Sequence, residues 1–384
     1  MFADVAGPVV TTQPNFPAGA ATIIVGWKAD KSDVNNDRKY YCMIPDTLFD
    51  ALACGARIAV RNAWFHAFAT SSGTPDEIDH IYAMTTEGIR ELGSQWSPIL
   101  HSKGLSLRLT GVFCHQTPKA HYVHPVDGPK APELGDLLIV HEHKDTNHQG
   151  TIEITRRAVL VQAKMVDEGV PAGGKVDQYQ EYLYEHWPPF ELKGRGPGPG
   201  TVRFLSGQRD FRPGINPGRY GLIEKAPHSG HKVFQIPYCF DFPWTYSEPR
   251  KPVRSAGGED AGAFIANMLY DTGWQRGRFA LIPPTPLALA TGTKNNHFDV
   301  TVEELLTLTA KKTLRFRAKA HITGPRGYPA LACFQKHYGV PGLLPDTGVG
   351  FAVTDSGGKG IPPEETAEPD FDDGISVILV ETGG

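Results

Sequence analysis

Two short apolar runs, at residues 134–140 and 158–164, constrain the fold more than any other feature of the sequence. Each run has the length of a single buried strand. Residues 145–150 lie between the two runs and carry the turn-forming sequence DTNHQG. The runs are therefore predicted to pair as a β-hairpin.

The segments around the hairpin predict a sheet flanked by helices. Pro75, Asp76 and Glu77 are typical of the first turn of a helix, and apolar residues then recur at helical spacing as far as Trp96. The same criteria predict a strand at 105–113, a helix at 175–187 and a strand at 201–205. Across residues 77–206 the order is helix, strand, strand, strand, helix, strand, which predicts an α/β fold with a mixed sheet flanked by helices.

Glycine and proline indicate that the remainder of the chain is rich in loops. The sequence holds 42 Gly and 32 Pro among 384 residues, well above the usual share. We divide it into an unassigned N-terminal segment (1–76), a core (77–206) and a loop-rich α+β C-terminal accessory region (207–384). Within the C-terminal region we predict strands at 219–223, 232–238, 314–320 and 349–353, and helices at 260–269 and 302–308.

The last part of the chain, residues 360–384, is acidic and contains no basic residue. Such a stretch is typical of a solvated tail. Its apolar run at 375–380 has the length of a strand, however, and could instead dock on a sheet.

Charge and cysteine content exclude several classes of protein. A formal net charge of −4 is incompatible with a strongly basic, histone-like nucleic-acid binder. The five cysteines are odd in number and form no C-x-x-C pair, which disfavours a disulfide scaffold or a cysteine-based zinc site. There is no signal-peptide pattern and no apolar run long enough to span a bilayer. We expect a cytoplasmic protein with no membrane partner.

The hairpin carries three polar residues that together suggest chemistry. Asp136 begins the first apolar run, whereas Gln162 and Lys164 end the second and share one face of their strand. Pairing of the strands would bring a carboxylate, an amide and an ammonium group to one edge of the sheet. Burying a lysine is unfavourable unless an anion compensates its charge. A carboxylate can hold Mg²⁺, which Mn²⁺ may replace, beside a substrate phosphate, and a lysine can then orient the attacking water. These residue types favour phosphodiester hydrolysis.

Asp136 followed by Gln162-x-Lys164, between two helices, resembles the PD-(D/E)XK nuclease superfamily. It is most similar to the Mrr-type variant, in which Gln replaces the acid before the Lys, and the resemblance covers about residues 87–205. It implies a restriction-endonuclease-like fold, with Asp136 and Gln162 as metal ligands and Lys164 as the catalytic lysine. The implied substrate is nucleic acid, with DNA the first expectation, and the implied role is restriction or anti-phage defence.

The resemblance also implies a further acidic ligand from the first helix. Glu87 and Glu91 are both candidates, and the sequence does not choose between them. Glu133, which precedes Asp136 in the same loop, is a third candidate for contact with the metal.

Two basic clusters, at 193–225 and 311–319, suit the tracking of phosphates, although a solvated basic face would have the same composition. In the second cluster, Arg315, Arg317 and Lys319 would share one face if the segment is a strand. The predicted nucleic-acid-binding residues are Arg203, Arg209, Arg212, Arg315, Arg317 and Lys319.

Two other functions stay open. A non-catalytic nucleic-acid-binding or assembly protein could keep a nuclease-like fold, but retention of the whole Asp136, Gln162 and Lys164 set argues against it. A β-barrel enzyme with a histidine-bound metal could use His141 and His143, an H-x-H pair, although scattered loop histidines explain these residues more simply. A homo-oligomer and an activating partner protein are both compatible with the sequence.

Overall fold

The computed structural model describes most of the chain beyond residue 43. The described residues are 44–71, 73–114, 118–146, 150, 152–167, 170–171, 177–195, 202–211, 217–225, 243–247, 259–270, 278–279, 297–316, 331–338 and 374–384. They all belong to one compact unit, Tyr41–Gly384, and the other unit, Met1–Tyr40, lies outside them. None of the described helices combines the length and apolar character needed to cross a membrane.

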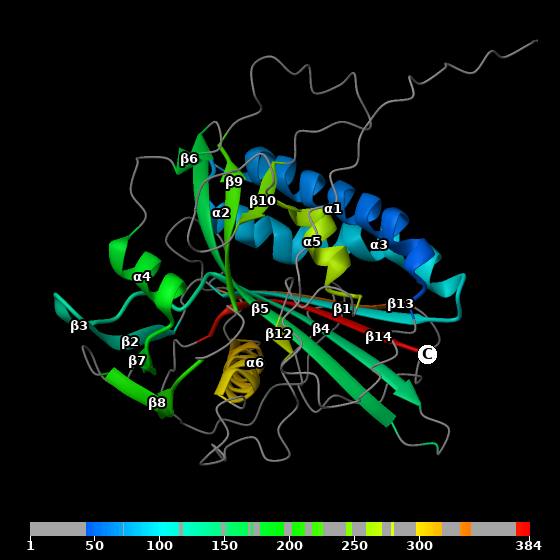
Figure 1. Cartoon of the computed structure of the whole chain (residues 1–384). Coiled ribbons are helices and arrows are strands. Elements are labelled where there is room, and N and C mark those ends of the chain that lie inside the picture. The colour runs from blue at the N-terminus through cyan, green and yellow to red at the C-terminus, as the bar shows by residue number, and fades with distance from the viewer. Residues whose placement is uncertain are drawn as a thin grey trace, which may run out of the picture. The chain divides into compact units, whose positions relative to one another are not determined.

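A large mixed β-sheet forms the centre of the Tyr41–Gly384 unit (Figure 1). Its strand order is β11-β10-β9-β5-β4-β14-β1-β13, and β6 and β12 also pair with β5. The strands are β1 (Ser106–Cys114), β4 (Leu137–Thr146), β5 (Ile152–Asp167), β6 (Val170–Pro171), β9 (Gly218–Glu224), β10 (Trp244–Ser247), β11 (Glu259–Asp260), β12 (Arg278–Phe279), β13 (Leu331–Tyr338) and β14 (Ser376–Gly383).

The predicted hairpin is confirmed, because β4 and β5 are antiparallel, from Leu137 opposite Val161 to Thr146 opposite Ile152. On its outer sides, β9 runs parallel to β5 and β14 runs parallel to β4. The sheet therefore contains both antiparallel and parallel pairs and is mixed, as the sequence predicts.

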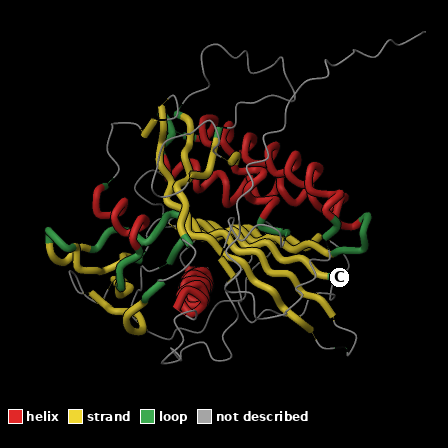
Figure 2. Tube along the Cα trace, viewed as in Figure 1, coloured by secondary structure: helices red, strands yellow, loops and turns green. Residues whose placement is uncertain are grey.

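Helices cover both faces of the sheet, as Figure 2 shows. One face packs against α1 (Phe49–Thr70), α2 (Glu77–Ala83), α3 (Ile89–His101) and α5 (Ala261–Asn267), and the other against α4 (Gln178–His186) and α6 (His297–Phe316). Alternation along the strands supplies both cores, since Ile139 and Val159 are buried on the first face and Leu138 and Leu160 on the second.

The predicted helix after Pro75 is confirmed as α2, a π-helical turn η3 (Met84–Gly88), and α3. Asp76 caps it by accepting hydrogen bonds from the backbone of Ile78 and Asp79, and the Asp79 carboxylate accepts one from the Asp76 N–H. The turn η3 lies very close to β1. A Cβ at Gly111 would lie 1.9 Å from the Thr85 carbonyl oxygen, so only glycine fits there.

A second, smaller sheet has the order β3-β2-β7-β8. Its strands are β2 (Lys119–His124), β3 (Gly128–Lys130), β7 (Phe190–Arg195) and β8 (Val202–Arg209), and α4 packs on one of its faces. The predicted strand at 201–205 is therefore real but belongs to this sheet. The strand that follows α4 into the large sheet is β9.

The predicted division at residue 206 is wrong. Strands β9, β10, β13 and β14 all come from the region treated as accessory, yet they belong to the same large sheet. The run at 375–380 is not part of a solvated tail, since β14 is buried between β4 and β1 in the middle of the sheet. The predicted alternative, that this run docks on a sheet, is confirmed.

Smaller predictions have mixed outcomes. The strand at 219–223 and the helices at 260–269 and 302–308 are confirmed as β9, α5 and α6. Residues 314–316 belong to α6, so the strand predicted at 314–320 is wrong over that part. Neither 232–238 nor 349–353 falls within the described residues.

Candidate active site

Asp136 and Gln162 are in direct contact at the start of β4. The pairing of β4 with β5 ends at Leu137 and Val161, and β5 continues past this point. The Asp136 carboxylate covers the next part of the β5 edge, where its Oδ2 accepts a hydrogen bond from the Ala163 N–H at 2.7 Å and another from the Gln162 side-chain amide. The side chain of Asp136 therefore takes the place of a neighbouring strand.

A second carboxylate, that of Glu77, lies further along the same edge. Its Oε1 accepts a hydrogen bond from the Met165 N–H at 3.2 Å. Because Ala163 and Met165 are two residues apart on one strand, their amide groups are about 7 Å apart. Lys164 lies between them, part-exposed, on the face of the strand that also carries Gln162.

Sequence reasoning missed Glu77, because an acid in the first turn of a helix is fully explained by the helix dipole. The predicted helix acids have other partners. Glu87 is ion-paired with Arg90, and Glu91 accepts a hydrogen bond from the Gln95 amide at 2.7 Å. The structure brings Glu77, rather than either of these residues, to the Asp136 site.

Gln180 on α4 is a further residue of the site that sequence reasoning missed. Its buried side-chain amide donates to the Gln162 side-chain oxygen and, at 3.4 Å, to the Glu133 carbonyl oxygen. One turn later, the Tyr184 hydroxyl donates to the Leu134 carbonyl oxygen at 2.8 Å. The i, i+4 spacing of Gln180 and Tyr184 is the sequence signal that could have placed both on the inner side of the helix.

These contacts define the orientation of Gln162. Its amide oxygen accepts from Gln180, and its amide nitrogen donates to Asp136. The resemblance implies that Gln162 binds the metal, whereas in the described arrangement its role is to hold the Asp136 carboxylate in position.

Burial raises the pKa of Asp136 to about 7. The negative charges of Glu133 and Glu77 raise it as well, whereas the Lys164 ammonium and the Ala163 N–H oppose the shift. Glu133 is exposed to solvent and Glu77 is part-exposed. The site thus sets three carboxylates against one lysine, an excess of negative charge that a bound cation would offset.

The donors present are suited to Mg²⁺, which prefers oxygen ligands and is commonly held by one or two carboxylates together with waters and substrate phosphates. Asp136 and Glu77 would be the main protein ligands, with Glu133 beside them. In the part of the chain that the structure describes, no three His, Cys, Asp or Glu side chains are arranged to hold a metal ion.

The predicted nucleic-acid-binding arginines have different outcomes. Arg209 is completely buried, donating to Thr301 Oγ1 and the Gly207 carbonyl oxygen, both at 3.1 Å, and pairing with Glu304. It joins β8 to α6, so its assignment to a nucleic-acid surface is wrong; a buried arginine needs such partners. Arg203 lies on β8, and Arg315 lies on α6, where a strand was expected. Arg212, Arg317 and Lys319 lie outside the described residues.

His141 and His143 lie on β4 rather than in a loop, and both are buried. Each places a ring nitrogen within hydrogen-bonding distance of Thr382 Oγ1, at 2.9 Å and 2.8 Å respectively. Burial lowers the pKa of both imidazoles, which favours their neutral forms. The pair serves to fasten β14 to β4.

Comparisons with protein-family models, with curated proteins and with solved structures give no match to this chain. The functional argument therefore rests on the residues and their geometry.

Proposed function

We propose that the chain is a metal-dependent nuclease that hydrolyses phosphodiester bonds of nucleic acid, with DNA as the first candidate substrate. The observation that carries this proposal is the pair of carboxylates on the β5 edge, Asp136 and Glu77, with Lys164 between them. A restriction-endonuclease-like fold belongs to the same proposal. It is supported by the β4–β5 hairpin and by the connection from β5 through α4 to the parallel strand β9.

In this proposal Asp136 and Glu77 would hold Mg²⁺ or Mn²⁺, and the Glu133 carboxylate would add negative charge nearby. The metal would stabilise negative charge that develops on the scissile phosphate. Lys164 binds a non-bridging phosphate oxygen and orients the attacking water. Gln162 and Gln180 are positioning residues, since they act on the phosphate only through the Asp136 carboxylate.

A cytoplasmic role in restriction or anti-phage defence is part of the same proposal. Cys54 and Cys114 are free thiols, which suits a reducing compartment. A homo-oligomer or an activating partner is compatible with this role.

The test is cleavage of supercoiled plasmid, linear duplex, single-stranded DNA and RNA, with Mg²⁺, with Mn²⁺ and with EDTA. Lys164→Ala is the site variant, and Lys103→Ala, at an exposed lysine after α3, is the matched control. We expect cutting that needs metal, that the control retains, and that falls by about a hundredfold or more in Lys164→Ala. Cutting that persists in Lys164→Ala would refute the site. Nucleic-acid binding without cutting in the wild type would favour the non-catalytic binding function.

A further inference from the structure

The smaller sheet turns one face toward α4 and the other away from it. Tyr122 of β2 is buried under α4, where its ring stacks on Tyr182 at 5.7 Å and its hydroxyl donates to the Tyr179 carbonyl oxygen at 2.6 Å. Because side chains alternate along a strand, Lys119 and His121 lie on the opposite face. Lys119 is exposed.

A row of residues crosses this outer face. The loop before β4 forms a bridge to β2 in which Glu133 lies opposite Lys119, and Lys119 in turn lies opposite Lys193 of β7. The row therefore places two lysines side by side, with Glu133 next to the first of them.

The row begins at the candidate active site. The Glu133 charge is one of those that raise the pKa of Asp136. Neighbouring strands are about 4.8 Å apart, so Lys193 lies about 10 Å from Glu133 across the sheet.

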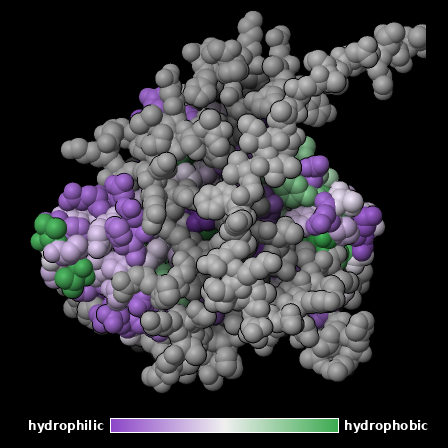
Figure 3. All heavy atoms as spheres, in the orientation of Figure 1, coloured by the Kyte–Doolittle hydropathy of each residue, from purple (hydrophilic) through white to green (hydrophobic). Residues whose placement is uncertain are grey.

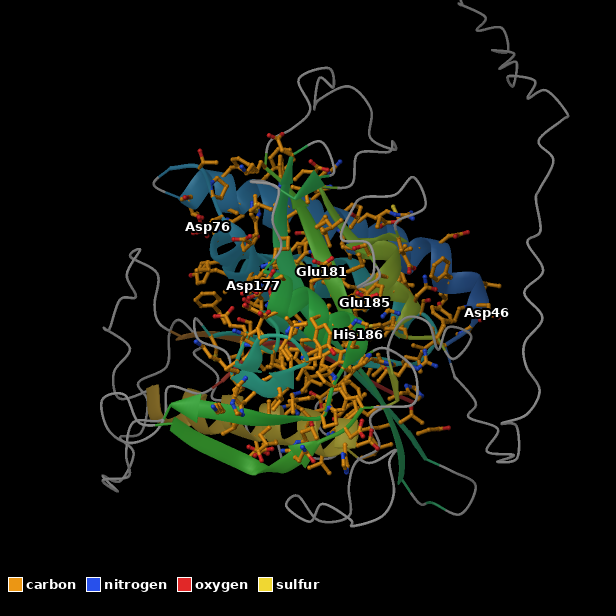
Figure 4. All side chains as sticks on the ribbon, turned by 60° about the vertical axis from the view of Figure 1, so that its left-hand side comes forward. Asp46, Asp76, Asp177, Glu181, Glu185 and His186 are labelled. Atoms are coloured by element: carbon orange, nitrogen blue, oxygen red, sulfur yellow. The ribbon has the colours of Figure 1, made fainter. Side chains whose placement is uncertain are left out.

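The other exit from the site, over α4, is acidic. Figure 4 shows Asp177 at the start of this helix and Glu181 and Glu185 along it. Figure 3 shows a mainly hydrophilic surface, with isolated apolar groups, on the side of the molecule where the smaller sheet lies. Besides Glu133, the described acid on the outer face of the sheet is Glu191, which lies opposite His121. A phosphate backbone leaving Asp136 would therefore meet two lysines as well as two glutamates over the sheet, but a row of carboxylates over the helix.

We propose that the outer face of the β3-β2-β7-β8 sheet, through Lys119 and Lys193, binds the sugar–phosphate backbone of the nucleic acid whose scissile bond lies at Asp136. This inference rests on the proposed function. It assigns backbone binding to two lysines that solvent can reach, in place of the buried Arg209.

The test compares wild type, the Lys119→Gln/Lys193→Gln double variant, and an Arg90→Gln/Lys103→Gln control that removes the same charge from the exposed α3 side. Binding of fluorescein-labelled single-stranded DNA, duplex DNA and RNA is measured by anisotropy with the full chain in EDTA, over a range of KCl concentrations. Cleavage in Mg²⁺ is measured on the same oligonucleotides.

We expect the slope of log K against log[KCl] to become shallower by about 1.4 for a single strand, or about 1.8 for duplex DNA, when two phosphate contacts are removed. KM should rise while kcat is retained, and the control should behave as wild type.

The outcomes separate this inference from the proposed function. Wild-type cutting with an unchanged slope and KM in the double variant would overturn the inference and leave the nuclease proposal standing. Binding without cutting, with the slope reduced as expected, would support the surface and refute the nuclease. A wild type that neither binds nor cuts would overturn both.

Discussion

Both ends of strand β4 carry charged groups, but the charges are balanced at one end and unbalanced at the other. Toward the C-terminal end of β4, each buried carboxylate is paired with a cation. Arg156 donates to Glu142 at 2.6 Å and to Glu303 of α6 at 2.6 Å. Glu381 of β14 is ion-paired with Arg108 at 3.1 Å and accepts a hydrogen bond from Lys144 at 3.3 Å. At its start, Asp136, Glu77 and Glu133 share one lysine.

The comparison shows how structural and functional polar groups can be told apart within one sheet. Buried charges that only support a fold must be paired, because an unpaired one is strongly destabilising. A set of carboxylates that stays partly open to solvent and in excess over its cations is instead arranged for a ligand of positive charge. The matched end of β4 holds β14 and α6, and the unmatched end holds the candidate active site.

The largest effect on cleavage is expected from Asp136→Asn, which changes the start of β4 and leaves the charge pairs at its other end intact. Cleavage should fall by about a thousandfold or more, because the substitution removes the carboxylate that we propose binds the metal. Stability in EDTA should rise instead, since a charge that is unfavourable in the folded state is lost. Steady-state cleavage and urea unfolding of the same preparation measure both, and a variant that loses stability and keeps its activity would contradict the assignment.

The stability difference between wild type and Asp136→Asn should depend on pH, and the sign of that dependence follows from the pKa of Asp136. The pKa of Asp136 in the folded chain is raised to about 7 from 3.8, so between about pH 4 and pH 7 the folded state binds more protons than the unfolded state. Its contribution therefore lowers stability as pH rises through that window, by roughly 4 kcal/mol at about 1.36 kcal/mol per pKa unit. Buried His80, whose pKa is lowered to about 4, acts in the opposite direction, so the measured quantity is the difference between wild type and Asp136→Asn. Saturating Mg²⁺ should reverse the trend.

At the matched end, Glu142→Gln should lower the free energy of unfolding by about 3 kcal/mol, because Arg156 is left with only part of its compensating charge. Activity per folded molecule should not change. Urea denaturation with an unchanged slope is the measurement, and Glu91→Gln, at a part-exposed position on α3, is the control. A neutral result would mean that the network is not needed for stability.

Glu77→Gln is expected to reduce cleavage by about a hundredfold and to raise the Mg²⁺ concentration required, since one of two carboxylates on the β5 edge loses its charge. Glu91→Gln, a residue predicted from sequence for the same role, should leave both quantities unchanged. The reverse result would restore the sequence prediction and remove Glu77 from the site.

The smallest effect is expected for the positioning residue Gln180. In Gln180→Leu the Gln162 amide is no longer held, and the Asp136 carboxylate loses part of its hydrogen bonding. We expect kcat to fall about tenfold and the acid limb of the pH–rate profile to move to higher pH, because the pKa of Asp136 rises further. Gln178→Leu, at an exposed position on the same helix, is the control. A drop in kcat without a shift of the profile would point to a purely structural role.

The sequence predicted those features that depend on neighbouring residues. The β4–β5 hairpin, the helix capped by Asp76 and helix α4 all follow from local periodicity and turn chemistry, and they account for the contact between Asp136 and Gln162. Sequence reasoning missed Glu77 because the helix dipole alone explains an acidic residue in the first turn of a helix.

Long-range pairing could not be predicted. Arg209 finds its partner Glu304 on α6, 95 residues away, and β14 finds β4 without any local signal of register. A charged residue gives no sequence-level indication of whether it will be paired inside or solvated outside.

The central place of β14 also has a consequence for synthesis. Asp136, Lys164 and Glu77 are all made by the time β5 ends at Asp167, but the strand that pairs with β4 begins only at Ser376. At about 5–20 residues per second, the ribosome needs about 10–40 s to cover that interval. Until β14 is made, β4 lacks its second neighbouring strand and the link to β1, so the hairpin that carries the candidate site is complete in sequence before the sheet can be completed. Translation thus separates the synthesis of the candidate-site residues from the assembly of the sheet that holds them.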